Sequence, residues 1–115
     1  GKGEKLRFYV LILANELKPF LEYQKKVIER EFPYSLEKAG CEIERLTIGE
    51  KYMELVFLIP VRADIKQALD KVINECNQYG NFLSQVFTIT NVKELSAEEV
   101  EEIIKKNGGN SQASH

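Results

Sequence analysis

The side chains with the strongest case for chemistry are a carboxylate and a guanidinium, Glu54 and Arg7, on two segments that alternate as β-strands. A carboxylate can accept a proton and an arginine can hold an anion, so the pair could serve a small enzyme that works without histidine. Tyr9 and Tyr52 fall at the same strand parity, where their rings could stack on bases or close a packed interface.

Other common chemistries lack their residues. The only histidine is His115, at the end of the chain, which excludes Ser-His and Cys-His catalysis and a histidine-based metal site. The only cysteines, Cys41 and Cys76, are too few for a four-cysteine zinc site, and we expect buried thiols rather than a disulfide. No glycine-rich phosphate motif is present. We therefore assign no catalytic residue, no metal ligand and no cofactor.

Composition predicts an ordinary globular domain. The 115 residues fit one domain, with 43% hydrophobic and 30% charged residues. A formal net charge of −2 gives no general attraction to nucleic acid or to an anionic membrane. No apolar run approaches the roughly 18 residues that span a bilayer. We expect a cytoplasmic protein with no membrane partner.

The chain is organised around a strand from Tyr52 to Pro60 and the helix that follows it, 64–79. Alternate residues of the strand are apolar on one side and partly apolar on the other, which is typical of a central strand. Asp64 caps the helix, with Gln67 three residues later, and Gly80 ends it.

The remaining segments complete a layered domain. We expect strands at 5–13, 41–48 and 82–92, a first helix that starts at Asn15 or Lys18 and is interrupted or kinked at Pro33, and a third helix at 96–107. The second strand changes parity, which a β-bulge near Glu44 and Arg45 would explain.

This order predicts an α+β fold, a ferredoxin-like βαββαβ sandwich with a four-stranded antiparallel sheet, two long helices on one face and an extra C-terminal helix. Residues 1–4 form a flexible lead-in, 5–107 the single domain and 108–115 a disordered tail. PII-like and ACT-like regulatory domains and RNA-binding RRM domains share this architecture, although no diagnostic motif of these families is matched.

The face of the sheet away from the two long helices is the candidate interface or binding face. It carries Arg7, Tyr9, Leu11, Leu13, Tyr52, Glu54, Val56 and Leu58. A face this apolar is rarely left bare. The C-terminal helix could cover it, a second subunit could cover it, or it could serve as a platform for a ligand or nucleic acid.

We favour the second subunit and predict a non-enzymatic, oligomeric regulatory or ligand-binding domain, with a small metabolite between subunits as a candidate ligand. One alternative is a single-stranded nucleic-acid-binding module that resembles an RRM domain and stacks bases on Tyr9 and Tyr52 of this open face. Nucleic acid is the less favoured partner, because Glu54 puts a negative charge on that platform. A second alternative is a small enzyme that uses carboxylates, for instance Glu54 with Arg7.

Overall fold

Four antiparallel strands form one sheet in the computed structural model, which describes residues 3–113. Their order across the sheet is β2-β3-β1-β4. The strands are β1 (Lys5–Ala14), β2 (Glu42–Ile48), β3 (Tyr52–Pro60) and β4 (Leu83–Thr90), and the helices are α1 (Glu22–Lys38), α2 (Ile65–Cys76) and α3 (Ala97–Ala113), with single turns η1 (Asn15–Leu17) and η2 (Asn77–Tyr79). This order and connectivity confirm the predicted ferredoxin-like α+β fold.

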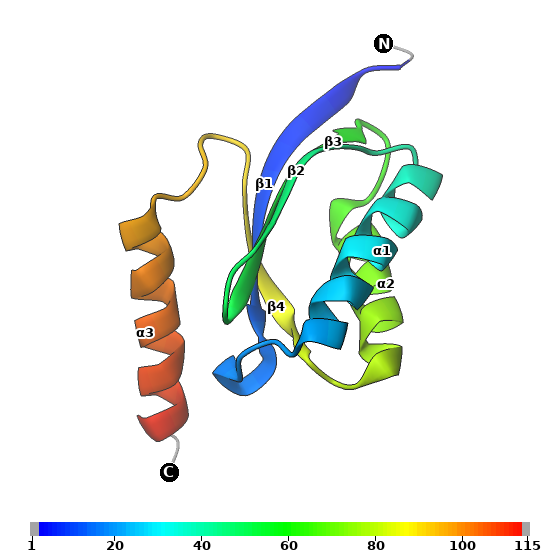
Figure 1. Ribbon diagram of the computed structural model, residues 1–115. Helices are drawn as coiled ribbons and strands as arrows, with labels where there is room; N and C mark the ends of the chain where they lie inside the picture. The colour runs from blue at the N-terminus through cyan, green and yellow to red at the C-terminus, as the bar shows by residue number, and fades with distance from the viewer. Residues whose placement is uncertain (1–2, 114–115) are drawn as a thin grey trace.

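The sheet separates two helical layers (Figure 1). Helices α1 and α2 cover one face, which we call the inner face, and α3 stands alone on the other, the outer face. The predicted alternation is confirmed, because the inward residues of the two central strands lie in the main core beneath α1 and α2. These are Val10, Ile12, Met53, Leu55, Phe57 and Ile59, with Phe8 packed at its edge.

Two helices begin with side-chain caps, and the cap predicted at Asp64 is one of them. The Asp64 side chain accepts a hydrogen bond from the Gln67 amide at 3.1 Å at the start of α2. Before α3, the Glu99 amide donates to Ser96 Oγ at 3.1 Å and the Ser96 amide donates to the Glu99 carboxylate at 2.8 Å, which is a complete capping box. These bonds satisfy amides that the first turn of a helix leaves without partners.

The first helix differs from the prediction. It begins at Glu22, after the single turn Asn15–Leu17, and continues through Pro33 to Lys38 without interruption. A proline inside a helix costs about 3 kcal/mol because it removes one hydrogen bond and crowds the preceding turn. The helix remains whole because Phe32 and Leu36, on either side of the proline, are fully buried in the main core.

The single turn after β1 is conformationally strained. Glu16 and Leu17 have φ angles of 57° and 56°, in the left-handed region that residues with a side chain rarely adopt. Leu17 nevertheless packs into the hydrophobic cluster of the outer face. Two consecutive strained residues therefore hold a side chain on the α3 side of the sheet.

The end of α3 also differs from the prediction. The helix continues past Gly108 to Ala113, within the segment predicted to be a disordered tail. Residues 1 and 2 of the predicted lead-in, and residues 114 and 115 with the single histidine, lie outside the described residues. No helix in the part of the chain that the structure describes is long and apolar enough to cross a bilayer.

Candidate functional site

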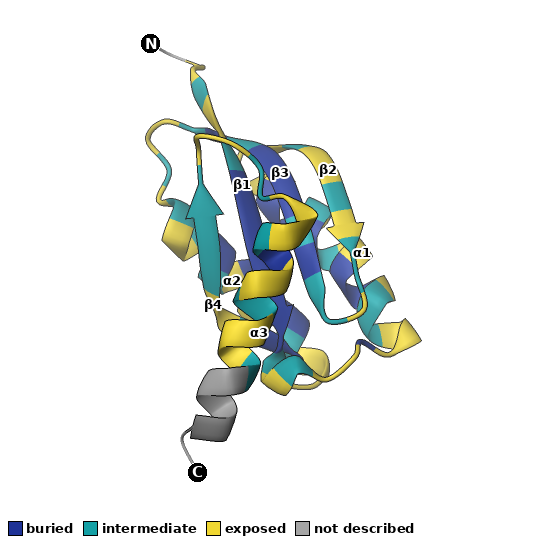
Figure 2. Ribbon diagram, turned by 90° about the vertical axis from the view of Figure 1, so that its left-hand side faces the viewer, coloured by how far each residue is buried: buried dark blue, intermediate teal, exposed yellow. Residues whose placement is uncertain are grey.

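The outer face is covered by α3 from the same chain (Figure 2). Four of its predicted residues are buried together with Val100 of α3, namely Tyr9, Leu11, Leu13 and Val56. Partly buried residues that complete this cluster are Leu17, Tyr52, Leu95, Ile103 and Ile104. The prediction that a second subunit covers the face loses its basis, because the apolar side chains are already removed from water by α3.

Tyr9 and Glu54 form a bond in the middle of this face. Tyr9 donates its hydroxyl hydrogen to Glu54 Oε2 at 2.6 Å, from β1 to the neighbouring strand β3. Tyr9 is 2% exposed, and burial together with this hydrogen bond raises the pKa of its phenol well above the usual range. A buried, protonated phenol cannot stack on a base, so the face in this state is not the aromatic platform that the RRM-like alternative requires.

The other aromatic residue of the face serves the β2–β3 hairpin. Tyr52 pairs with Leu13 on β1, and its ring lies over Gly49 in the turn. A Cβ atom at Gly49 would come within 2.5 Å of that ring, so a larger residue at this position would have to displace the Tyr52 side chain. Leu58, opposite Arg7 in the sheet, is half-buried at the other end of the face.

The predicted β-bulge in β2 is present and decides what the outer face carries. Ile43 pairs with Phe57 and Arg45 pairs with the next residue, Val56, so Glu44 is an extra residue without a partner in the ladder. Because side chains alternate along a strand, this insertion turns Arg45 to the side of Val56, the outer face. Without the bulge, Arg45 would share the inward parity of Ile43.

The bulge brings two arginines to the same end of the outer face. Arg7 Nε donates to Glu44 at 2.7 Å, and Arg7 Nη2 donates to Glu94 Oε2 at 3.2 Å. Arg45 Nη2 donates to the other oxygen of the same carboxylate, Glu94 Oε1. Hydrogen bonding to Arg45, and then to Arg7, lowers the pKa of Glu94 and keeps it ionised.

This arrangement is a two-arginine site for one anionic group. Each arginine side chain is about half exposed, at 50% for Arg7 and 49% for Arg45, so water and ligands reach both. Planar guanidinium groups suit carboxylate and phosphate oxygens equally well. We call Arg7, Arg45 and Glu94 the arginine site. Sequence reasoning placed Arg7 on the face and the bulge at Arg45, but nothing in the sequence marked Glu94, in the β4–α3 loop, as their partner.

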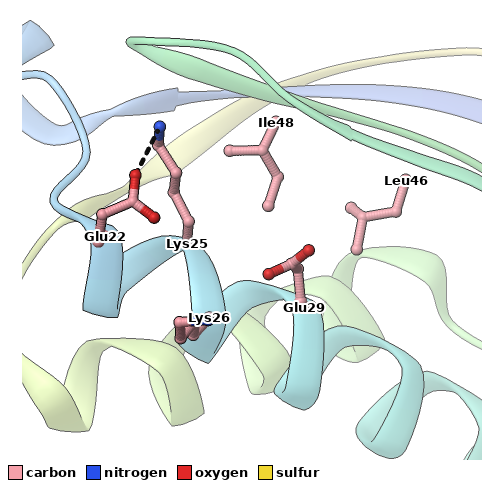
Figure 3. A pocket seen from close by; sticks show the side chains of 6 residues that line it. All are labelled: Glu22, Lys25, Lys26, Glu29, Leu46 and Ile48. Atoms are coloured by element: carbon pink, nitrogen blue, oxygen red, sulfur yellow. Dashed lines mark hydrogen bonds and ion pairs between the residues drawn. The ribbon is translucent and has the colours of Figure 1, made fainter.

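A second surface feature is a groove of about 580 Å³ between α1 and the edge strand β2 (Figure 3). Leu46 and Ile48 point from β2 toward α1, which contributes the charged side chains of Glu22, Lys25, Lys26 and Glu29. Lys25 Nζ lies 3.5 Å from Glu22 Oε1, so these two side chains form an ion pair. Two positive and two negative charges cancel, so this groove offers no net attraction to an anion.

Metal ligands are not gathered into a site within residues 3–113. No group of three or more histidine, cysteine, aspartate or glutamate side chains that could hold a metal ion occurs there. Cys41 and Cys76 are free and buried, as predicted. Burial raises the pKa of the Cys76 thiol to about 12, so it is not a reactive nucleophile at neutral pH.

Two solved structures that are described as transposases share this fold. A candidate transposase from Deinococcus radiodurans R1 superposes with a TM-score of 0.73 at 14% identity, over 92% of this chain and 95% of that one. A REP-associated tyrosine transposase bound to a REP hairpin superposes with a TM-score of 0.64 at 10% identity, over 84% of this chain and 60% of that one. No family model matches the sequence, and no curated protein matches it.

These neighbours correct two predictions. The predicted non-enzymatic regulatory or ligand-binding domain is contradicted, because the structures that share this fold are described as transposases. The accompanying expectation that the chain is not an enzyme is contradicted as well, since both neighbours are described by the name of a class of enzymes. The nucleic-acid alternative agrees better with the neighbours, one of which holds a hairpin.

Proposed function

We propose that this chain is a nucleic-acid-binding domain of the transposase type and that it binds a DNA hairpin or single strand through the arginine site. The fold shared with a transposase over nearly the full length of both chains carries this proposal. The hairpin-bound neighbour supports the choice of ligand. The arginine site supports the choice of surface, because it is the end of the outer face where exposed guanidinium groups converge.

The chemistry of the site suits phosphate. Arg7 lies near the start of β1 and Arg45 in the middle of β2, on either side of β3, and both side chains donate to one position that is now filled by a carboxylate. A phosphate group offers the same kind of oxygen acceptors. The binding mode differs from the RRM-like alternative, since it relies on charge at the edge of α3 and not on stacking against Tyr9.

Binding to a labelled DNA hairpin, followed by fluorescence anisotropy across a salt series, tests the proposal. Arg7→Gln and Arg45→Gln should each weaken binding and reduce the salt slope by about 1, as expected for the loss of one phosphate contact. The matched control is Arg30→Gln on α1, which is 55% exposed and also ion-paired but lies on the inner side of the sheet. Equal losses in all three variants would contradict the assignment of the site.

Strand cleavage is a second candidate function, favoured by the bond between Tyr9 and Glu54. If Glu54 accepts the phenol proton, Tyr9 Oη can attack a phosphorus atom, form a phosphotyrosine bond and release the sugar oxygen as a hydroxyl after it takes a proton from water. The raised pKa and the cover of α3 oppose this reaction in the present state, so α3 must first leave the face.

Incubation with an end-labelled hairpin, followed by a denaturing gel, tests cleavage. A covalent protein–DNA adduct is expected in the wild type and should be absent from Tyr9→Phe, which keeps the ring. Glu54→Gln should slow its formation because the glutamine side chain cannot accept the proton. An adduct that persists in Tyr9→Phe would assign the nucleophile to another residue.

A further inference from the structure

We propose that α3 and its preceding loop form a cover held closed by Glu94, and that a nucleic-acid phosphate opens it by taking the position of the Glu94 carboxylate between Arg7 and Arg45. This inference rests on the proposed function and adds its regulation. The first observation is geometric: one carboxylate from the β4–α3 loop accepts hydrogen bonds from two arginines of the sheet. An anion site is thus filled by the chain itself.

The second observation is that the ionic contact can be exchanged. Glu94 has a side-chain exposure of 35% and the two arginines are half exposed, so all three groups meet solvent. Ion pairs at such positions are screened by salt and contribute little stability. A polyanion that presents phosphate at high local density can therefore compete with a single carboxylate.

The third observation concerns how little else holds the cover. Val100 is the one fully buried residue of α3 as far as Gly108, and Leu95, Ile103 and Ile104 are partly buried. The loop before the helix is largely exposed, with Val92 at 87%. Helices with few buried contacts open at lower free energy than the core does. At the other end of α3, Leu17 contributes to the contact from a strained backbone, which favours release.

Closure of the cover and binding of phosphate therefore compete, because both use the guanidinium groups of Arg7 and Arg45. While Glu94 is bound, the two positive charges of Arg7 and Arg45 are balanced by the two negative charges of Glu44 and Glu94. When Glu94 leaves, both guanidinium groups are available and only Glu44 remains on Arg7. The apparent affinity for nucleic acid is reduced by the fraction of molecules in which the site is occupied by Glu94.

Glu94→Gln separates the charge of the cover from its shape. The glutamine keeps the size of the side chain but loses the ion pairs, so hydrogen exchange of the α3 amides should become faster in the absence of DNA. The affinity for a labelled DNA hairpin should rise about fivefold or more. The control is Glu98→Gln, the same change on the exposed first turn of α3, which should alter neither quantity.

Arg45→Gln distinguishes the cover from the phosphate site. This variant also breaks the contact with Glu94, so α3 exchange should become faster, but the affinity for the hairpin should fall. If it rises as in Glu94→Gln, the arginines do not hold phosphate and the proposal is overturned. Addition of the hairpin to the wild type should by itself speed α3 exchange.

Three other results have distinct meanings. Unchanged α3 exchange in Glu94→Gln overturns the cover, whatever the DNA results are. An unchanged affinity in Glu94→Gln, with a wild type that binds, overturns the competition between carboxylate and phosphate. Faster exchange without hairpin binding by any variant overturns the proposed function and the phosphate assignment together, and leaves only a salt-bridged helix.

Discussion

The two faces of the sheet are buried to very different extents. Among the described residues, nineteen buried side chains form the cluster between the sheet and α1 and α2, whereas five form the cluster beneath α3. The inner cluster joins the sheet to two helices, so the sheet cannot unfold unless this cluster is disrupted. The outer cluster depends on one helix. This chain therefore has a core that specifies the fold and a cover that can open while the fold persists.

The largest effect is expected from damage to the inner face. Phe57→Ala removes a fully buried ring from β3 and should lower the free energy of unfolding by about 3–5 kcal/mol, measured by urea denaturation. Val86→Ala on β4, where the side chain is 80% exposed, should change it by less than about 0.5 kcal/mol. Similar losses in the two variants would show that burial does not distinguish these positions.

Alkaline pH should affect the two faces in sequence. Burial raises the pKa of Cys76, on the inner side, to about 12, against about 8.5 for an unfolded thiol. As the pH rises, the unfolded chain loses this proton before the folded chain does. The contribution of Cys76 to stability is therefore fully present below a pH of about 8.5, and the free energy of unfolding falls by up to about 1.4 kcal/mol per pH unit between there and pH 12. Cys76→Ala should flatten this fall in urea titrations at several pH values.

The outer-face counterpart begins later. Burial raises the pKa of Tyr9, and an unfolded tyrosine ionises near pH 10, so its contribution to stability is lost only above about that value. Tyr9→Phe should remove this later loss and leave the earlier one. A single onset that both variants abolish would mean that the faces do not titrate independently.

Damage to the cover should have a smaller and more local effect. Val100→Asp places a charge in the outer cluster, and α3 should detach from the sheet because burial of that charge is unfavourable. We expect a loss of about 1–2 kcal/mol in global stability, with fast hydrogen exchange in α3 and unchanged exchange in β3. Glu101→Asp, at the next and exposed position of the helix, is the control. Loss of protection in β3 would contradict the independence of the cover.

The smallest effect concerns the strained turn that supports α3. Glu16→Gly relieves a left-handed backbone and should stabilise the protein by about 1 kcal/mol or less. Glu16→Ala removes the same side chain but keeps the strain, so the difference in melting midpoint between the two variants isolates the backbone. Equal midpoints would show that the turn is not strained in solution.

The inner face could be predicted from sequence because its signal is local. Alternation in β1 and β3 and the cap at Asp64 each depend on residues close together in the chain, and the structure confirms them. The predicted interruption of α1 at Pro33 was wrong, because tertiary packing of Phe32 and Leu36 outweighs the local cost of a proline.

The arginine site could be predicted only in part. The change of parity in β2 revealed the bulge, but the partner of Arg45 is Glu94, about fifty positions later in a loop without periodicity. Cover of the outer face by α3 was one of three alternatives. The apolar pattern of the face does not distinguish a helix of the same chain from a second subunit, since both would bury the same side chains. The likeness to transposases lies in backbone geometry at 14% identity and left no motif to recognise.

The bulge also determines where this domain can change in length. Ile43 and Arg45 face consecutive residues of β3, so the hairpin contains one residue more than its ladder requires. Removal of Glu44 would leave a regular strand with every later pair in place, whereas a deletion elsewhere in the strand would turn core side chains toward water. The domain therefore tolerates a one-residue deletion at this point of β2. The deletion would remove the carboxylate beside Arg7 and leave the architecture unchanged.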